Sequence, residues 1–151
     1  MAYWLLKTEP EEYSFDDLVR DRRGEWDGVR NHLARNHLAA MKPGDECLIY
    51  HTGKARVVVG TAVVVRAAYP DPTADDPRWL AVALESGRRL PVPVPLAAMR
   101  SEEALAGMDI LKQTRLSVCP VSAREWRTIL RLARGAPAHK PARRKATGER
   151  P

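Results

Sequence analysis

Three short segments of the chain combine polar, charged and aromatic side chains more densely than folding requires. They are Lys7-Thr8-Glu9-Pro10, Trp26-Asp27-Gly28-Val29-Arg30-Asn31 and Tyr50-His51-Thr52-Gly53. Each segment stands where a predicted helix or strand meets a loop, a position from which side chains can reach a ligand while the scaffold holds them. The three segments are therefore the first candidates for a binding or catalytic site.

Trp26 and Asn31 have side chains suited to a nucleic-acid base. Trp26 lies between Gly24-Glu25 and Asp27-Gly28, which predicts a turn rather than an apolar face. An indole in a turn either plugs the end of a barrel or offers a flat surface on which a base can stack. Asn31 precedes a predicted helix, where it can act as the N-cap. Its amide can also read a base edge, because it carries a donor and an acceptor side by side.

Basic residues beside these segments are candidates for phosphate contacts. Arg30 and Arg35 are separated by slightly more than one helical turn, and Lys54 follows the third segment in a loop. We predict phosphate contacts for Arg30, Arg35 and Lys54, although a solvated helix face explains the two arginines equally well.

Metal and thiol chemistry are not expected from the histidine and cysteine positions. His32, His37 and His51 form neither an i,i+4 pair nor a His-x-His motif. Cys47 and Cys119 lie 72 positions apart without a Cys-x-x-Cys pair, which argues against a disulfide framework and a zinc site. We interpret both cysteines as buried, inert thiols, and we predict no metal and no cofactor.

The positive charge of the chain is concentrated at its end. The formal net charge is +6, but residues 134–151 hold six basic residues against Glu149 alone. Residues 1–133 keep 19 basic and 18 acidic residues and are nearly neutral. The last segment has no large apolar side chain, so we predict a disordered basic tail that attracts phosphates without sequence preference or simply aids solubility.

Length and composition predict one domain, residues 1–133, followed by that tail. The chain has 151 residues, of which 44% are hydrophobic and 29% are charged, which suits a single compact core. It has no recognisable signal peptide or membrane-spanning run, so we expect a cytoplasmic protein.

Hydrophobic periodicity and turn residues predict a mixed α+β fold. Helices are expected at residues 14–21, 31–41 and 123–133, with a helical stretch near 95–106. Strands are expected at residues 3–7, 47–51, 56–67, 79–84, 89–94 and 115–118, with Ser86-Gly87 as the turn between the fourth and fifth of them. Five or six short strands in succession predict a small closed or half-closed β-barrel with flanking helices.

Several stretches together closely resemble the EVE domain family, which includes the thymocyte nuclear protein 1 group. They are YWLLKTEPEEYSFDDL, WDGVRNHLARNHLAAMKPGDECLIYHTG, VVGTAVVVRAAYPDP, Arg78-Trp79 and RLSVCPVSAREW, in order from about Tyr3 to Leu132. The resemblance implies a PUA-like β-barrel related to YTH and ASCH domains. It also implies a non-catalytic reader of modified bases, chiefly modified cytosine in DNA, acting with a separate nuclease or other defence protein.

Carried over by position, the resemblance implies a pocket at the barrel mouth. Lys7, Thr8 and Glu9 would line one wall. Trp26 and Asn31 would provide the aromatic face and the edge reader. Tyr50, His51 and Thr52 would lie opposite, with Thr52 standing where the family usually has serine.

An enzyme is the main alternative. Related ASCH proteins include amidohydrolases that act on acylated cytidine through Lys, Thr and Glu, and this chain has Lys7-Thr8-Glu9 in succession. Neighbours on a strand point to opposite faces, so Lys7 and Glu9 share a pocket only if Thr8 turns away. A barrel that binds only other proteins is a third possibility.

Overall fold

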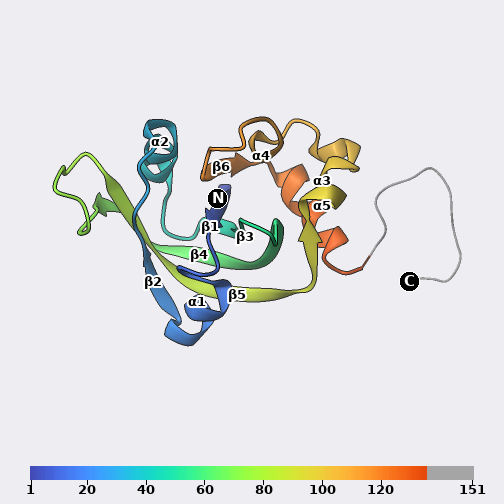
Figure 1. The fold of residues 1–151 in the computed structure, drawn as a ribbon, viewed down its shortest axis with the longest axis horizontal. Helices are drawn as coiled ribbons and strands as arrows, with labels where there is room; N and C mark the ends of the chain where they lie inside the picture. The colour runs from blue at the N-terminus through green and yellow to red at the C-terminus, as the bar shows by residue number, and fades with distance from the viewer. Residues whose placement is uncertain (136–151) are drawn as a thin grey trace, which may run out of the picture.

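The computed structural model describes residues 1–135. In chain order the elements are β1 (Tyr3–Thr8), α1 (Phe15–Asp21), β2 (Arg23–Trp26), α2 (His32–Ala40), β3 (Glu46–His51), β4 (Val57–Pro70), β5 (Leu80–Pro95), α3 (Leu96–Arg100), the 3₁₀ helix η1 (Glu103–Leu105), α4 (Asp109–Lys112), β6 (Val118–Val121) and α5 (Ala123–Leu132). The helices α3 and α5 gather at one end of the molecule, and the loop between β4 and β5 projects from the other (Figure 1). The predicted tail lies almost entirely outside the described residues.

The six strands form one mixed sheet in the order β2-β5-β4-β3-β1-β6. Within this sheet β1 and β3 pair in parallel, and the other neighbouring pairs are antiparallel. The α+β class is confirmed, but the predicted barrel is wrong, because the sheet does not close. The edge strands β2 and β6 each pair with a single neighbour and not with each other.

The two long central strands, β4 and β5, differ from the sequence prediction. The two strands expected at 79–84 and 89–94 form one continuous strand that begins at Leu80, so Ser86-Gly87 is not a turn. A Cβ atom on Gly87 would lie 2.4 Å from the Thr61 hydroxyl, which shows that glycine permits a close approach to β4. Register shifts between β4 and β5 bend the pair along its length.

The helix starts agree with the predictions because their signals are local. Ser14 and Ser122 each form a capping box, with Asp17 and Glu125 respectively. Asn31 caps α2 by accepting a hydrogen bond from the backbone N–H of Ala34. The helical stretch expected near residues 95–106 consists of α3 and η1, with α4 following separately.

Two short edge strands were misplaced or missed in the sequence prediction. The strand expected at residues 115–118 lies at 118–121 as β6, paired with β1. The strand β2 was not expected at all, because Arg-Gly-Glu-Trp has little apolar character, and it is held by pairing with β5. Among residues 1–135, none of the helices has the length and apolar character needed to cross a membrane.

Candidate functional site

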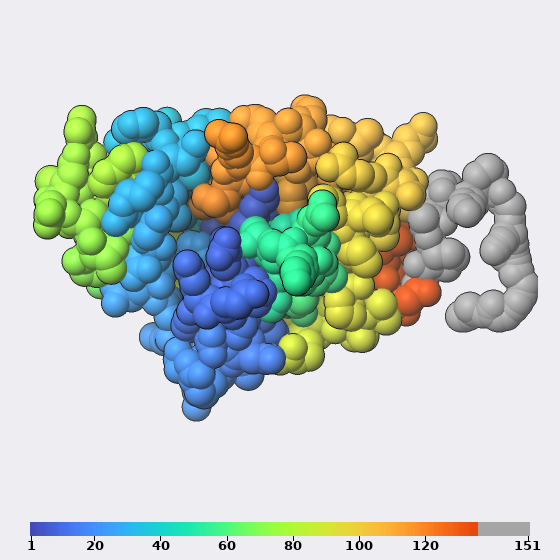
Figure 2. All heavy atoms as spheres, viewed as in Figure 1, coloured from blue at the N-terminus to red at the C-terminus, as the bar shows by residue number. Residues whose placement is uncertain are grey.

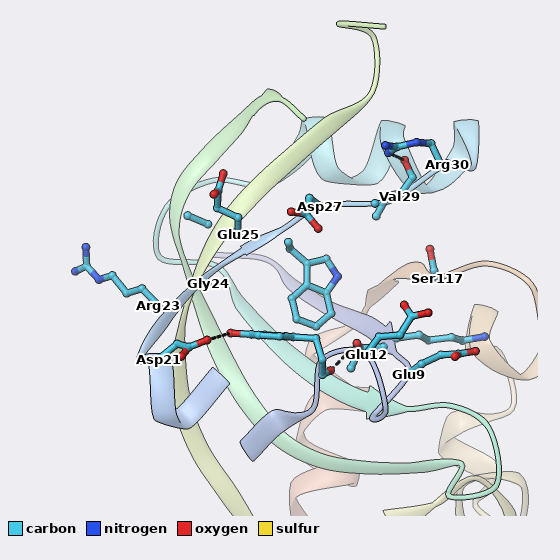
Figure 3. Close-up of a pocket in the computed structure, with 16 residues that line it drawn as sticks. Glu9, Glu12, Asp21, Arg23, Gly24, Glu25, Asp27, Val29, Arg30 and Ser117 are labelled. Carbon is cyan, nitrogen blue, oxygen red and sulfur yellow. Dashed lines mark hydrogen bonds between the residues drawn. The ribbon is translucent and has the colours of Figure 1, made fainter. Parts of the chain in front are cut away.

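The main cleft, with a volume of about 900 Å³, opens between the end of β1 and the edge strand β2 (Figure 3). Its walls come from the end of β1, the following turn, the end of α1, β2, the loop after β2, and single residues of β5 and the segment before β6. The lining residues are Lys7, Thr8, Glu9, Glu12, Tyr13, Asp21, Arg23, Gly24, Glu25, Trp26, Asp27, Gly28, Val29, Arg30, Ala83 and Ser117.

Hydrogen bonds fix the wall formed after β1. The backbone N–H of Tyr13 donates to the Glu9 carbonyl oxygen at 2.9 Å, which closes the turn. The Thr8 hydroxyl donates to the Tyr13 carbonyl oxygen at 2.7 Å. The Tyr13 hydroxyl donates to Asp21 at 2.9 Å, and burial together with this carboxylate raises the pKa of Tyr13 to about 12. This tyrosine is therefore a neutral donor that ties the turn to the end of α1.

Trp26 is a strand residue, which corrects its expected position in a turn. It ends β2, pairs with Val82 of β5 and is only 6% exposed. Its ring meets that of Tyr13 edge to face, with centroids 6.3 Å apart. Trp26 thus belongs to the core and to the cleft wall at once, and it offers a ligand a small part of its surface.

The loop after β2 is held by the buried carboxylate of Asp71, which comes from the loop between β4 and β5. This side chain is 0% exposed and lies 2.9 Å from the Arg30 guanidinium. The backbone N–H of Gly28 donates to it at 2.8 Å, and Thr73 donates through both its N–H and its hydroxyl. Burial alone would raise the pKa of Asp71, but these hydrogen bonds hold it well below its usual range.

Asp71→Asn is expected to lower the free energy of unfolding at pH 7 by about 2 to 3 kcal/mol, because buried donors lose a charged acceptor. The folded-state pKa of Asp71 is depressed, so its contribution is present above the unfolded-state pKa and is lost as the pH falls. Urea unfolding between about pH 7 and pH 2 is therefore expected to show a shallower pH dependence in the variant than in the parent.

Asp76→Asn is the matched control for that measurement. Asp76 lies in the same loop, and its carboxylate pairs with the exposed Arg78 at 2.8 Å. This change is expected to have a much smaller effect, because solvent screens the pair. Equal losses in the two variants would contradict the assignment of Asp71 as the anchor of the loop.

Acidic groups outnumber basic groups around the main cleft. Three basic residues, Lys7, Arg23 and Arg30, line it together with five acidic ones, Glu9, Glu12, Asp21, Glu25 and Asp27. Figure 3 shows the Asp27 carboxylate directed into the cleft, with Glu9 and Glu12 across from it, while Arg23 and Glu25 point outward. Desolvation, followed by the charges of Asp71 and Glu25, raises the pKa of Asp27. The cleft therefore suits a ligand rich in hydrogen-bond donors better than an anion.

The residues expected to line one pocket are divided among several places. Lys7, Thr8, Glu9 and Trp26 line the main cleft. Tyr50 and Thr52 line instead a small hollow of about 190 Å³, together with Lys7, Gly53, Arg56, Leu96, Arg100, Ile110 and Thr114. Lys7 is the residue that the two spaces share.

Asn31 and His51 have structural partners away from the main cleft. Asn31 caps α2 and borders a separate hollow beside residues 112–116. The Nε2 atom of His51 accepts a hydrogen bond from the backbone N–H of Phe15 at 3.0 Å, and burial lowers its pKa. His51 is therefore a neutral acceptor that ties the start of α1 to the end of β3.

The three basic residues expected to contact phosphate also lie apart. Arg30 lines the main cleft and pairs with Asp71. Arg35 is half-buried on α2 and donates to Asn36, and Lys54 is exposed in the turn after β3.

Glu12, Tyr13, Asp27 and Ser117 line the cleft, although no role was predicted for any of them from the sequence. Asp27 stands inside the second candidate segment, and its place directly after an indole was the available signal. Ser117 gave no such signal, because it reaches the cleft through the pairing that places its carbonyl oxygen 2.9 Å from the backbone N of Lys7.

The histidine, cysteine and acidic side chains of residues 1–135 are the candidates for metal binding, and the two cysteines are the candidates for thiol chemistry. Within residues 1–135, no three His, Cys, Asp or Glu side chains are grouped so that they could hold a metal ion. Cys47 and Cys119 are free and buried, and burial raises the pKa of both thiols, that of Cys119 to about 11. Neither thiol is activated as a nucleophile.

Comparison with known proteins identifies the family. A model of the EVE domain matches residues 2–132. Mouse thymocyte nuclear protein 1 is 33% identical over an alignment 170 positions long, which covers 90% of this chain and 75% of the mouse protein. The chain belongs to the EVE domain family, as the sequence resemblance predicted.

Solved structures agree with this assignment. Rpa0253 from Rhodopseudomonas palustris is 41% identical, with a TM-score of 0.83 and coverage of 88% of this chain and 93% of that one. The human THYN1 protein in complex with DNA containing 5-methylcytosine is 31% identical, with a TM-score of 0.84 and coverage of 91% and 100%. ASCH from Zymomonas mobilis, at 13% identity and a TM-score of 0.56, shares the fold alone.

Proposed function

We propose that this protein is a non-catalytic reader that takes a modified cytosine of DNA, 5-methylcytosine in particular, into the main cleft. The observation that carries the proposal is the inward-facing Asp27 carboxylate beside an apolar wall, in a chain similar to a protein crystallised with 5-methylcytosine DNA (Figure 3). Recognition of this kind needs no cofactor. Any cleavage of the bound DNA would belong to a separate partner.

The cleft offers complementary groups to the edge of cytosine. A carboxylate accepts hydrogen bonds from the exocyclic N4 amino group, which thymine lacks. Val29 is buried and lies two residues after Asp27, and Ala83 lines the cleft on β5. C5, which carries the methyl group, is bonded to C4, which carries the N4 amino group. The methyl group would therefore meet this apolar wall while N4 meets Asp27.

The energies set the size of the expected selectivity. Burying one methyl group contributes about 0.8 kcal/mol, or roughly a fourfold gain in affinity. A matched hydrogen bond to the base edge contributes about 1 to 3 kcal/mol of discrimination. Extruding a paired base costs a few kcal/mol, so a single-stranded ligand is expected to bind more tightly than a duplex.

A set of short single-stranded DNAs that differ at one central base tests the proposal. The 5-methylcytosine strand is expected to bind about fourfold more tightly than the cytosine strand and at least about tenfold more tightly than the thymine strand. The first comparison isolates the methyl group and the second isolates the amino edge. Equal fluorescence-anisotropy titrations for all three strands would contradict the proposal.

A small amidohydrolase is the second candidate, because Lys7, Thr8 and Glu9 do line one cleft. Their hydrogen bonds disfavour it, since the Lys7 ammonium donates to the Thr114 carbonyl oxygen at 2.7 Å and the Thr8 hydroxyl donates to Tyr13. A base acting on Thr8 would have to accept that hydroxyl proton. Release of cytidine from N4-acetylcytidine by the purified protein would favour the hydrolase.

A further inference from the structure

The small hollow shares one lining residue, Lys7, with the main cleft. It is formed by the ends of β1 and β3, the turn that follows β3, α3, and the segment from α4 to Thr114. Figure 2 shows the turn after β3, in green, beside the first residues of the chain and the 96–112 region. Three parts of the chain far apart in sequence therefore meet here.

Positive charge is gathered in this hollow without an acidic counterpart. Lys7, Arg56 and Arg100 line it, and none of the Asp and Glu residues in the described part of the chain does. Within residues 1–135, neither arginine has a hydrogen-bond or ion-pair partner for its guanidinium. The hollow thus contrasts with the main cleft, where carboxylates are in excess.

Tyr50 places a hydroxyl among these cations. Its ring is buried, and the Lys7 ammonium lies 5.9 Å from the ring centroid. Burial raises the pKa of Tyr50, although the charges of Arg56 and Arg100 act to lower it. The tyrosine is thus a neutral hydrogen-bond donor, a suitable companion to guanidinium groups around a phosphate.

The backbone of Arg56 is held in an unfavourable conformation. Its φ is 44°, a region that side-chain-bearing residues rarely adopt. Its carbonyl oxygen accepts a hydrogen bond at 2.9 Å from the N–H of Leu96, the first residue of α3. Strain of this kind persists where the surrounding structure holds it and is often found at binding sites.

We propose that the small hollow binds a backbone phosphate of the nucleic-acid strand whose modified base occupies the main cleft. The inference rests on the proposed function. The excess of carboxylates repels phosphate from the main cleft, so a strand that inserts a base there needs a cationic site close by. Lys7 borders both spaces, and the planar guanidinium groups of Arg56 and Arg100 suit phosphate oxygens.

Four small ligands separate the contribution of the base from that of the phosphate. Isothermal titration at low salt compares 5-methyl-2′-deoxycytidine, its 3′- and 5′-monophosphates, and inorganic phosphate. At least one monophosphate is expected to bind about tenfold more tightly than the nucleoside, because its phosphate gains a charge-assisted hydrogen bond. That gain is expected to disappear in Arg56→Gly and Arg100→Gln, while the affinity for the nucleoside stays the same.

The variants are chosen so that the fold survives. Glycine accepts the φ of residue 56, so Arg56→Gly is expected to keep or raise the melting temperature while it removes the phosphate gain. Arg88→Gln is the matched control, because Arg88 is exposed on β5 and lines neither space. This variant is expected to retain the full gain.

The outcomes distinguish the two proposals. Nucleoside binding without any gain from either monophosphate, or a gain that survives both arginine variants, overturns the phosphate site and leaves the reader intact. Absence of nucleoside binding, with phosphate binding that requires Arg56 and Arg100, overturns the reader and identifies an anion site for free phosphate instead. If Arg88→Gln lost the extra affinity for the monophosphate to the same extent, that affinity would come from net charge, and the phosphate site would be overturned.

Discussion

Trp26→Ala is expected to lower the free energy of unfolding by about 3 to 5 kcal/mol. The indole is 6% exposed and packs in the core against Tyr13, so its removal leaves a cavity as well as a gap in the cleft wall. Urea unfolding followed by circular dichroism measures the loss. Because the variant loses stability, its affinity must be compared at a temperature where it is fully folded.

Trp79→Ala is the control for this substitution. Trp79 stacks on His32 with ring centroids 4.9 Å apart, is only partly buried and lies outside the main cleft. Its removal is expected to destabilise the protein clearly less. A Trp26→Ala variant as stable as Trp79→Ala would contradict the placement of Trp26 in the core.

Asp27→Ala is expected to weaken binding of a strand carrying 5-methylcytosine by about tenfold to a hundredfold, because the N4 amino group loses its acceptor. The side chain is exposed and its removal creates no cavity, so the melting temperature is expected to stay close to that of the parent. The preference for 5-methylcytosine over thymine is expected to fall with the affinity, while the preference over cytosine remains.

Asp75→Ala is the matched control, because Asp75 is an exposed aspartate in the loop between β4 and β5 and does not line the cleft. It changes the net charge by the same amount. If both variants weakened binding equally, the effect would come from general electrostatics, and Asp27 would lose its assignment as the group that recognises the base.

Local signals in the sequence were sufficient for the helices and for part of the sheet. Ser14, Asn31 and Ser122 act as N-caps through hydrogen bonds to residues three positions later, so neighbouring residues alone predict them. Closure of the sheet depends on whether its edges meet, which no local pattern determines. Gly87 was misread for the same reason, since its role is to leave space for Thr61.

The site shows the same division between local and tertiary information. Lys7, Thr8 and Glu9 share a cleft because β1 ends at Thr8, and a strand end followed by polar residues is visible in sequence. The anchor of the next loop is Asp71, more than forty positions from Gly28, and its hydrogen bonds arise only in the folded chain. His51 stands beside candidate residues in sequence, and its bond to the N–H of Phe15 gives it a structural role that its sequence position does not reveal.

The most direct test of the central claim is a crystal structure of this protein with a short single strand carrying one 5-methylcytosine. The base is expected in the main cleft, with N4 at about 2.7 to 3.2 Å from the Asp27 carboxylate and the C5 methyl group against Val29. A 5-methylcytosine bound outside the main cleft, or one whose N4 edge faces solvent, would contradict the account.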